Sequence, residues 1–248
     1  MNYNLIEKTP STNTFIEENV NNLPDWYVLR AIEQTNGRGR FERTWFCEKN
    51  KDLAMSVLIP CDEIILKNLP NITQITGISV AQVLEALPFP DTASILIKWP
   101  NDILIKPSSG ETARKICGIL TQALSVGEKT KIIAGIGLNV NSERKSADEI
   151  CAVSLFDETK KTFDLDTLAK ETAKKIAENL NRLRENGLSE FIEILNEKLA
   201  FKNEEKTFMY GKKQIFGTIL GVGDGGELLL KTRNEILRIV SGEISSVS

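Results

Sequence analysis

Short apolar runs alternate with segments of helical periodicity along the first 203 residues, and this alternation constrains the fold more than any other feature. Runs of β-branched and large apolar residues predict strands, whereas apolar residues spaced three and four apart predict helices. Strands are expected at Tyr27–Ile32, Leu53–Ile59, Ser94–Trp99, Lys115–Leu124 and Lys131–Val140. Helices are expected after Ser11, at Ile72–Leu87, from Asp166 to Gly187 and from Ser189 to about Leu199. This order is typical of an α/β or α+β domain in which helices pack on a sheet.

Residues that begin or end helices support these limits. We expect Ser11 and Asp166 to cap helices, because short polar side chains accept hydrogen bonds from the free amides at a helix start. Gly187 and the prolines at 88 and 90 end the helices before them. The polar stretch from Lys106 to Thr112 contains Pro-Ser-Ser-Gly and is expected to be a turn on the surface.

The pattern changes at about Asn203, where helices give way to short strands. The strands are expected at Thr207–Tyr210, Gln214–Leu220, Glu227–Thr232 and Glu235–Val240, with turns at Gly211, Gly223–Gly226 and Arg233–Asn234. Short antiparallel strands joined by tight turns predict a small β-barrel packed on the larger domain. We therefore expect two domains, residues 1–203 and residues 204–248.

The composition restricts the classes of function. A chain of 248 residues that is 41% hydrophobic and 26% charged is typical of a globular protein of one or two domains. Its formal net charge of -3 argues against a general affinity for nucleic acid or anionic membranes. No apolar run approaches the roughly 20 residues that span a bilayer, and the first ten residues lack the pattern of a signal peptide. We expect a cytoplasmic protein without nucleic-acid or membrane partners, and the oligomeric state stays open, a homodimer included.

The cysteine and histidine content limits the chemistry further. The four cysteines, Cys47, Cys61, Cys117 and Cys151, are scattered without CxxC spacing, so we expect them to be reduced and mostly buried. The chain contains no histidine, which excludes Ser-His-Asp and Cys-His catalysis and histidine metal sites. Catalysis must therefore use lysine, arginine, carboxylates, hydroxyls and backbone amides, and no resident metal site is expected.

The strongest local signal is a segment rich in glycine and arginine, Gln34-Thr-Asn-Gly-Arg-Gly-Arg-Phe-Glu-Arg-Thr-Trp45. Its glycines, Gly37 and Gly39, let backbone amides approach a ligand closely, and its three arginines supply guanidinium groups that bind phosphate through paired hydrogen bonds. Trp45 offers a flat face on which an adenine or a cation can stack. Glu42 stands where a dinucleotide fingerprint has its third glycine, and no P-loop Gly-Lys-Ser/Thr follows. On local grounds a solvated basic turn explains the segment about equally well.

A second signal is Lys98-Trp-Pro-Asn-Asp102, directly after an expected strand. A lysine at the end of a strand can meet a carboxylate or phosphate in a cleft while its aliphatic stem stays packed. Pro100 restrains the backbone on both sides of it, and Asn101 and Asp102 are expected to form the turn. In isolation, a strand end with ordinary turn residues is the better explanation.

Glycines inside expected strands give a third signal. Gly135 and Gly137 precede Asn139 in one apolar run, and Gly118 lies in another. A glycine within a strand marks a bulge or a place where a ligand lies against the backbone. Core packing explains the runs about as well, and helix capping is the simpler explanation of Ser11-Thr-Asn13.

Taken in order, these segments resemble the motifs of bacterial biotin–protein ligases. The segments are Ser11-Thr-Asn, Gly37-Arg-Gly-Arg, Lys98-Trp-Pro-Asn-Asp, Lys115-Ile-Cys-Gly-Ile-Leu and Gly135-Ile-Gly-Leu-Asn, with Gln214-Ile-Phe-Gly and Gly242-Glu-Ile-Ser in the tail. The resemblance covers nearly the whole chain. It implies a mixed-sheet catalytic domain with a small C-terminal β-barrel, which forms biotinyl-5′-AMP from biotin and Mg-ATP and transfers biotin to a lysine of a biotin carboxyl carrier domain. Only ten residues precede Ser11, so we expect a ligase without the DNA-binding repressor domain of some members.

The resemblance also implies roles for individual residues. Biotin would be bound by Ser11, Thr12, Asn13, Gln34, Gly37, Arg38, Gly39, Arg40, Lys98, Gly118 and Gly135. The nucleotide would be bound by Arg38, Arg40, Trp45 and Asn139, and the catalytic residues would be Lys98, Arg38 and Arg40. Fixed cations offset the repulsion between a carboxylate and a polyphosphate, so the reaction needs neither histidine nor a covalent enzyme intermediate.

The sequence departs from the family motifs at two places, and two alternative functions stay open. Glu42 replaces a glycine of the family loop, and Leu53-Ala54 stands where Leu-Tyr is common. A lipoate–protein ligase has a related fold but is expected to show a histidine-containing motif. A regulator that binds biotin without turnover is the alternative of another class. Asp102 is a weak candidate for the base that deprotonates the acceptor lysine.

We predict that Arg38→Ala or Lys98→Ala reduces adenylate formation by on the order of 100-fold or more, because each variant removes a fixed cation from the reacting groups. The fold should stay intact. Pyrophosphate release measures the effect, and near-normal release from either variant would contradict these roles.

Overall fold

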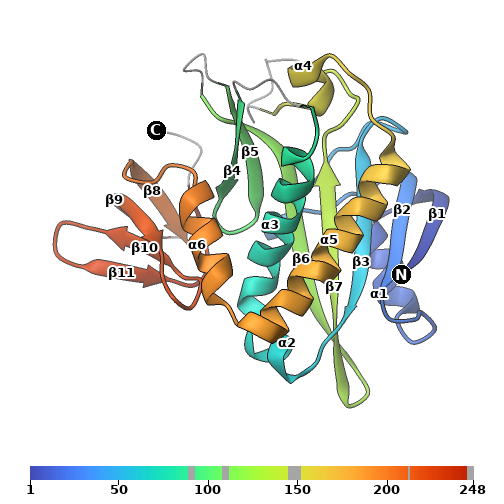
Figure 1. Cartoon of the computed structure of the whole chain (residues 1–248), viewed down its shortest axis with the longest axis horizontal. Coiled ribbons are helices and arrows are strands. Elements are labelled where there is room, and N and C mark those ends of the chain that lie inside the picture. Colours follow the sequence, from blue (N-terminus) through green and yellow to red (C-terminus); the bar gives the residue numbers. More distant parts are fainter. Residues whose placement is uncertain (89–92, 108–111, 145–151, 212, 245–248) are drawn as a thin grey trace.

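The structure is a computed structural model that describes residues 1–88, 93–107, 112–144, 152–211 and 213–244. Its larger part is built on a seven-stranded sheet in the order β1-β2-β3-β7-β6-β5-β4 (Figure 1). The strands are β1 (Asn2–Thr9), β2 (Tyr27–Gln34), β3 (Leu53–Pro60), β4 (Ala93–Lys98), β5 (Asp102–Pro107), β6 (Arg114–Val126) and β7 (Lys129–Leu138). β1 and β2 are parallel, and the other neighbouring pairs are antiparallel. The predicted mixed-sheet α/β fold is confirmed.

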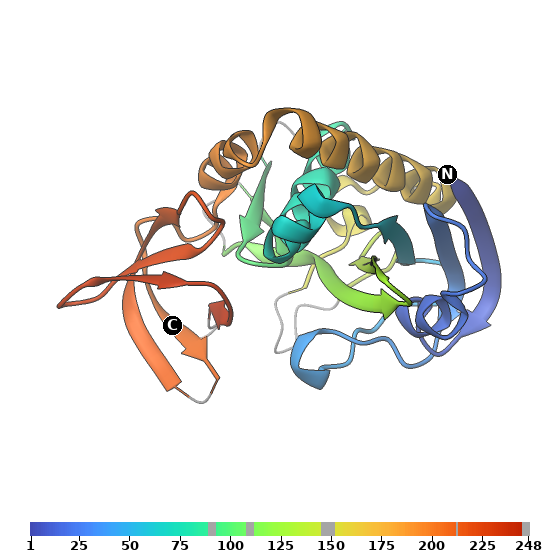
Figure 2. The same cartoon turned by 90° about the horizontal axis from the view of Figure 1, so that it is seen from below.

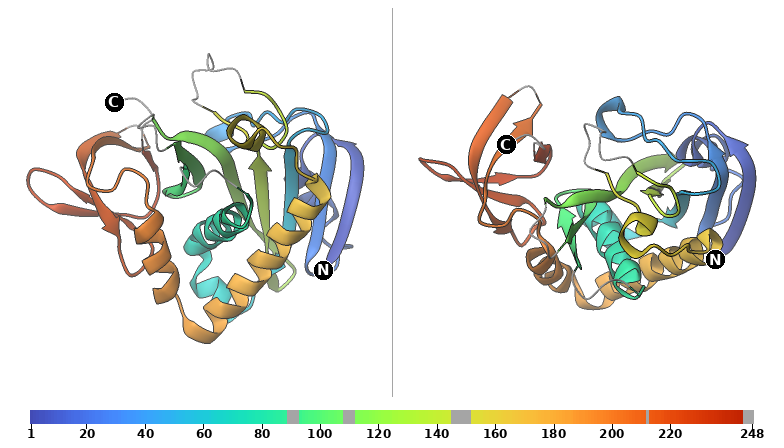
Figure 3. Two further views of the ribbon diagram at one scale, coloured as in Figure 1. Left: turned by 45° about the horizontal axis from the view of Figure 1, so that its top comes forward. Right: turned by 90° about the horizontal axis from the view of Figure 1, so that it is seen from above.

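The helices cover the two faces of this sheet unequally. They are α1 (Thr12–Asn19), α2 (Glu63–Lys67), α3 (Ile72–Glu85), α4 (Leu155–Thr159), α5 (Leu165–Asn186) and α6 (Ser189–Lys198). α3 and α5 lie on one face (Figures 1 and 3), where they share a large apolar cluster with Leu53, Met55 and Val57 of β3. Alternate residues of a strand point to opposite faces, and Leu58 accordingly packs with Ile16 of α1 on the other face.

Small residues occupy the middle of this second face. In the sheet register, Ser56 lies opposite Gly135, Ala54 opposite Gly137, and Gly137 opposite Gly118. Directly opposite residues point to the same side of a sheet. Gly118, Gly135 and Gly137 therefore lie together on this face of β6 and β7 and form a glycine floor, which Leu120 of β6 borders opposite Gly135.

The last part of the chain forms an antiparallel sheet in the order β11-β10-β9-β8-β12 (Figure 2). Its strands are β8 (Glu205–Tyr210), β9 (Lys213–Val222), β10 (Leu228–Lys231), β11 (Ile236–Ile239) and β12 (Glu243–Ile244). The expected small C-terminal β unit is confirmed. Within the described residues its edge strands β11 and β12 do not pair with each other, so it is an open sheet and not a closed barrel.

This smaller sheet is anchored on the larger part through apolar and polar contacts. The ring centroids of Trp99 and Phe208 are 6.0 Å apart. The Trp99 indole nitrogen donates a hydrogen bond to the Gly226 carbonyl at 2.9 Å, and Gln74 Nε2 donates to the same oxygen at 2.7 Å. Because one buried apolar cluster includes residues from both sheets, the expected division at residue 203 stays a prediction.

Two helix starts differ from the expected capping. Asp164, not Asp166, caps α5 and accepts a hydrogen bond from the Thr167 amide at 2.7 Å. Asp166 lies in the first turn, where it pairs with Arg30 at 2.8 Å. Ser11 does occupy the N-cap of α1, but its side chain makes no capping hydrogen bond. Asp164 and Asp166 are chemically equivalent candidates for the cap, and only the backbone geometry shows which of them occupies the N-cap.

Three strands were not expected from the sequence. β1 is a partly exposed edge strand with no apolar alternation, and β12 has only two residues. β5 begins at Asp102, so the turn after Lys98 is shorter than predicted. Lys106, the first residue of the expected surface turn, lies within this strand. The apolar Ile103-Leu-Ile105 run is buried but too short to stand out beside the neighbouring polar motif. Residues 108–111 of that loop and Pro90 lie outside the described residues.

We predict that Phe208→Ala lowers the free energy of unfolding by about 3–5 kcal/mol, because it leaves a cavity where the two sheets meet. Phe216→Ala on β9 is the matched control, since that ring is 61% exposed and its loss should change stability by about 0.5 kcal/mol or less. Urea denaturation followed by circular dichroism measures both. Equal stability of the two variants would show that Phe208 does not join the sheets energetically.

Candidate active site

A cleft opens over the glycine floor, on the side of the large sheet away from α3 and α5. Its walls come from α1, from the segment after β2, from β4 to β7 and from β12 of the smaller sheet. All the site residues predicted from the sequence except Gly37 line this cleft. Gly37 belongs to the segment that forms one wall but does not itself line the cleft.

The glycine floor is covered by two side chains of the predicted site. A Cβ atom on Gly137 would lie 2.1 Å from Trp45 Nε1, and one on Gly118 would lie 2.8 Å from Trp45 Cζ3. A Cβ atom on Gly135 would lie 2.2 Å from Asn13 Oδ1. The sequence suggested that a ligand lies against Gly118 and Gly135, whereas in the structure Trp45 and Asn13 make the close approach.

An uncharged polar cluster surrounds the start of α1. Gln34 Oε1 accepts a hydrogen bond from the Thr12 amide at 3.0 Å. The Ser56 hydroxyl lies 2.7 Å from Thr12 Oγ1 and 2.6 Å from Asn13 Oδ1. Asn13 Nδ2 donates to Gln122 Oε1 at 2.7 Å. Neighbouring Ser11 is also buried and lines the cleft.

Ser56 and Gln122 of this cluster were missed in the sequence. Ser56 interrupts an otherwise apolar strand, and it is completely buried. A lone serine inside an apolar strand is a signal that could have been used, because a buried hydroxyl requires a hydrogen-bond partner. Gln122 carries no comparable signal, since it lies where β6 has only partly exposed and exposed residues.

The Gly–Arg segment folds back on itself beside the glycine floor. The Trp45 amide donates to the Gly37 carbonyl at 2.9 Å, and the Gly39 amide donates to the Arg43 carbonyl at 2.7 Å. A Cβ atom on Gly37 would lie 2.3 Å from the Trp45 carbonyl oxygen, so the backbones approach too closely for any side chain. The two bonds set the position of Trp45 relative to the arginines.

The tip of this segment has a left-handed backbone. Phe41 and Glu42 have φ values of 55° and 59°. This conformation costs a residue with a Cβ about 1–3 kcal/mol, whereas glycine adopts it readily. Glu42 therefore occupies a position whose geometry favours the glycine of the family loop. The exposed Phe41 ring lies 4.9 Å from the Arg40 guanidinium carbon, a cation–π contact at the same tip.

The three arginines of the segment have different partners. Arg43 forms a two-point ion pair with Glu243 of β12, at 2.8 and 2.5 Å. Arg40 Nη1 donates to the Gly242 carbonyl at 2.9 Å, and burial lowers the pKa of its guanidinium. Arg38 is exposed to the cleft and has no hydrogen-bond or ion-pair partner in the part of the chain that the structure describes. Arg38 is thus the cation best placed to accept an anion.

Two lysines line the same cleft as these arginines. Lys98 is the register partner of Asp102 at the β4–β5 turn, and burial lowers the pKa of its amine while Asp102 opposes the shift. Lys115 pairs with Asp102 at 2.7 Å, and its amine lies 5.2 Å from the centroid of the Trp45 ring. Lys115 was not among the predicted site residues, although it begins the strand motif that contains Gly118. A charged residue at the start of that apolar strand is the signal that could have identified it.

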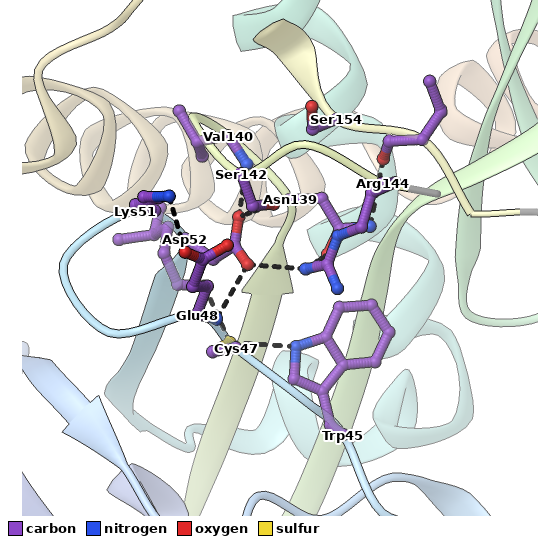
Figure 4. A network of polar contacts seen from close by, with 12 residues as sticks. Trp45, Cys47, Glu48, Lys51, Asp52, Asn139, Val140, Ser142, Arg144 and Ser154 are labelled. Carbon is purple, nitrogen blue, oxygen red and sulfur yellow. Dashed lines mark hydrogen bonds and ion pairs between the residues drawn. The ribbon is translucent and has the colours of Figure 1, made fainter. Parts of the chain in front are cut away.

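Asn139 is oriented by protein groups at the far end of the cleft (Figure 4). Its Nδ2 donates to the Val153 carbonyl at 3.0 Å, and its Oδ1 accepts from Arg144 Nη2 at 2.7 Å. Arg144 is also paired with the buried Asp52 at 2.5 Å. The sequence prediction included Asn139 but neither Arg144 nor Asp52. Asn139 therefore reaches the cleft as part of a network and not as a free donor and acceptor.

Most of the predicted site lies in the part of the chain that matches a known family model. Residues 5–139 match the model of the biotin/lipoate A/B protein ligase family. The chain belongs to this family. The match includes the start of α1, the Gly–Arg segment, both lysines, the glycine floor and Asn139, and it ends before Arg144.

Similar relatives in this ligase family come from several bacteria. The bifunctional ligase/repressor BirA of Bacillus spizizenii is 31% identical over 231 residues, which cover 90% of this chain and 67% of the relative. BirA of Escherichia coli is 26% identical over 237 residues, covering 95% and 71%. A biotin protein ligase from Aquifex aeolicus, solved in complex with biotin and ATP, is 30% identical with a TM-score of 0.82, covering 98% of this chain and 97% of that one.

Other features of the site concern metals, membranes and thiols. The described residues contain no group of three or more Cys, Asp or Glu side chains placed to hold a metal ion. None of their helices is long and apolar enough to cross a membrane. Cys47, Cys61 and Cys117 are free thiols, and burial, reinforced by Asp52, raises the pKa of Cys47 to about 12. Cys151 lies outside the described residues.

We predict that Gly137→Ala displaces the Trp45 indole from the glycine floor, because the added methyl would overlap the ring. The expected result is a red-shifted tryptophan emission that disappears when the same substitution is made in a Trp45→Phe background. Gly77→Ala in α3 is the control, since its Cβ would meet its nearest side-chain atoms at 3.5 and 3.6 Å, which is ordinary contact. An unshifted emission from Gly137→Ala would show that the indole does not rest on β7.

Proposed function

We propose that this chain is an ATP-dependent biotin–protein ligase. It would form biotinyl-5′-AMP and pyrophosphate from biotin and Mg-ATP, and then transfer biotin to a lysine of a biotin carboxyl carrier domain. The observation that carries the proposal is the juxtaposition, in one cleft, of an uncharged polar cluster with a group of lysines and arginines. The similarity to a biotin protein ligase bound to biotin and ATP supports the choice of substrates.

The polar cluster suits the ring end of biotin. A ureido group has two N–H donors and one carbonyl acceptor but no charge. Thr12, Asn13, Gln34 and Ser56 offer hydroxyls and amides of both polarities without a charged group among them. Buried uncharged groups that are already hydrogen-bonded to one another hold their geometry before a ligand arrives. We infer that the ring of biotin binds here, with its carboxylate directed toward the cations.

The cations suit the first chemical step. A carboxylate oxygen of biotin attacks the α-phosphorus, the bond from that phosphorus to the bridging oxygen breaks, and pyrophosphate leaves. Two anions must approach each other, and Arg38, Lys98 and Lys115 lower that repulsion with their positive charge in the cleft. Mg²⁺ would enter on the triphosphate as part of the substrate, because the described residues hold no acidic cluster of their own for it.

The second step transfers the biotinyl group to an amine. A neutral lysine amine of the carrier domain attacks the carbonyl carbon of the mixed anhydride, the bond to the phosphate oxygen breaks, and AMP leaves with its charge. The amine loses a proton in this step. Asp102 is the carboxylate nearest the two lysines, but its ion pair with Lys115 keeps it a weak candidate for the base.

Two alternative functions are separated by one experiment. The purified chain is incubated with Mg-ATP, an apo carrier domain and either biotin or lipoate, and the modified lysine is identified by mass spectrometry. We expect biotinylation that requires ATP. Transfer of lipoate in place of biotin would support a lipoate–protein ligase, and binding of biotin without transfer would support a regulator; either result would overturn the proposal.

We further predict that Lys115→Gln reduces biotinyl-5′-AMP formation by on the order of 100-fold or more, because it removes a cation that Asp102 and the Trp45 ring hold in the cleft. Pyrophosphate release at saturating biotin and ATP measures the loss. Lys174→Gln is the control, since Lys174 is an exposed residue of α5 that pairs only loosely, at 4.0 Å, with Glu178. Equal rates in the two variants would remove Lys115 from the reaction.

A further inference from the structure

A fully buried carboxylate organises the end of the cleft beyond Trp45 (Figure 4). The Asp52 side chain has no exposed surface and accepts four hydrogen bonds. Its Oδ1 accepts from the Val140 amide at 2.9 Å and the Ser142 hydroxyl at 2.7 Å. Its Oδ2 accepts from the Glu48 amide at 2.9 Å and Arg144 Nη2 at 2.5 Å. An ionised carboxylate has about four acceptor sites, so Asp52 is fully engaged and joins the segment after Trp45 to the end of β7.

Arg144 is held in one orientation by these contacts. Its side chain is 11% exposed and lines the cleft. The same Nη2 atom donates both to Asp52 and to Asn139 Oδ1 at 2.7 Å, while Nε is buried without a hydrogen-bond partner. The guanidinium carbon lies 5.8 Å from the centroid of Phe46, a ring that is 67% exposed. A long flexible side chain is thereby fixed beside an exposed aromatic ring at a wall of the cleft.

The partners of Arg144 make it unsuited to phosphate and suited to a flat, uncharged group. Arginine binds phosphate through paired N–H groups and a net positive charge. Here Asp52 neutralises the charge, and Nη2 is used twice by the protein. A guanidinium also stacks on planar groups through its weakly hydrated face, and this property does not require a net charge. Arg38, which is exposed and without a partner in the described residues, has the opposite character.

From this contrast we propose that the base of the nucleotide lies against the guanidinium face of Arg144, and that Asp52 is the positioning residue that holds Arg144 there. The inference rests on the proposed function for the presence of a nucleotide. It adds a specificity determinant beyond the residues predicted from the sequence. The cleft then has a phosphate end at Arg38 and a base end at Arg144.

The test measures binding, so that it does not depend on turnover. Isothermal titration calorimetry gives the dissociation constants of Mg-ATP, Mg-CTP and inorganic tripolyphosphate for the full chain and for Arg144→Met, Arg144→Lys and Asp52→Asn. We expect each variant to weaken ATP by about tenfold, the loss of one stacking contact, and to narrow the preference for ATP over CTP. Tripolyphosphate and biotin should bind as they do to the unmodified chain. Arg144→Lys should not restore ATP binding, because lysine keeps the positive charge but lacks the planar guanidinium group.

Two variants at an ion pair elsewhere in the chain, in which only the arginine is buried, provide the control. Arg30 and Asp166 form an ion pair at 2.8 Å in which the arginine is 5% exposed, and neither residue lines the cleft. Arg30→Met and Asp166→Asn should lower stability without changing the ratio of ATP to CTP affinity. If Asp52→Asn does not fold, Arg144→Met alone still decides, because its side chain lies at the wall of the cleft.

Three results would overturn the inference. Tripolyphosphate binding that weakens together with ATP binding would make Arg144 a phosphate ligand. Tighter ATP binding by Asp52→Asn would also make Arg144 a phosphate ligand, since that change removes the negative charge that neutralises the Arg144 guanidinium. An unchanged ATP-to-CTP ratio in all three variants would leave the pair with a structural role only. Nucleotide binding without biotin transfer would overturn the proposed function but not this inference, whereas absence of nucleotide binding would overturn both.

Discussion

The indole of Trp45 lies directly on the backbone of β6 and β7, and the rest of the cleft depends on this contact. It is available only because the register of β3, β7 and β6 places Gly137 opposite both Ala54 and Gly118 on one face of the sheet. The opposite face packs against α3 and α5 and therefore keeps its large apolar residues. Since Trp45 also ends the Gly–Arg segment and is bonded to Gly37, the contact sets where the arginines leave the sheet.

Most of the cations at the site are paired with carboxylates of the protein. Asp102 pairs with Lys115, Glu243 with Arg43, and Asp52 with Arg144. Burial lowers the pKa of both Lys98 and Arg40, while the nearby carboxylates Asp102 and Glu243 oppose the shift. A desolvated cation interacts with an incoming anion more strongly than an exposed one does, because less of the interaction is screened by water. A chain with a slight negative net charge can in this way concentrate attraction for anions in a single cleft.

Much of this arrangement was predictable from the sequence, and the exceptions have a common cause. The long apolar strands, the main helices and the ordered motifs were visible because each is a local pattern of about five to twenty residues. The site residues that the sequence did not predict contact the site only because strands and loops distant in the chain lie side by side. They are Ser56, Lys115, Asp52 and Arg144. β1 was missed for a related reason, since an edge strand that pairs on one side needs no continuous apolar pattern.

The glycines show that a sequence pattern can mark a place of close approach without identifying the group that approaches. Gly118 and Gly135 were selected because a ligand could lie against their backbones. In the structure the close approach is made by Trp45 and by Asn13. Only the three-dimensional register shows which side chain fills the space above a glycine, because a missing Cβ indicates that something is close without indicating what it is.

The smaller sheet contributes to the site through orientation more than through binding energy. Glu243 and Gly242 contact Arg43 and Arg40, yet the Arg43 side chain is 63% exposed, and an exposed ion pair contributes only about 0–1 kcal/mol. That is too little to hold a five-stranded sheet in place. The buried contact of Trp99 with Phe208 and the burial of Ile244 supply the attachment, since burying one large apolar side chain contributes about 1.5–3 kcal/mol. The apolar junction therefore fixes β12, and β12 in turn directs two arginines toward the cleft.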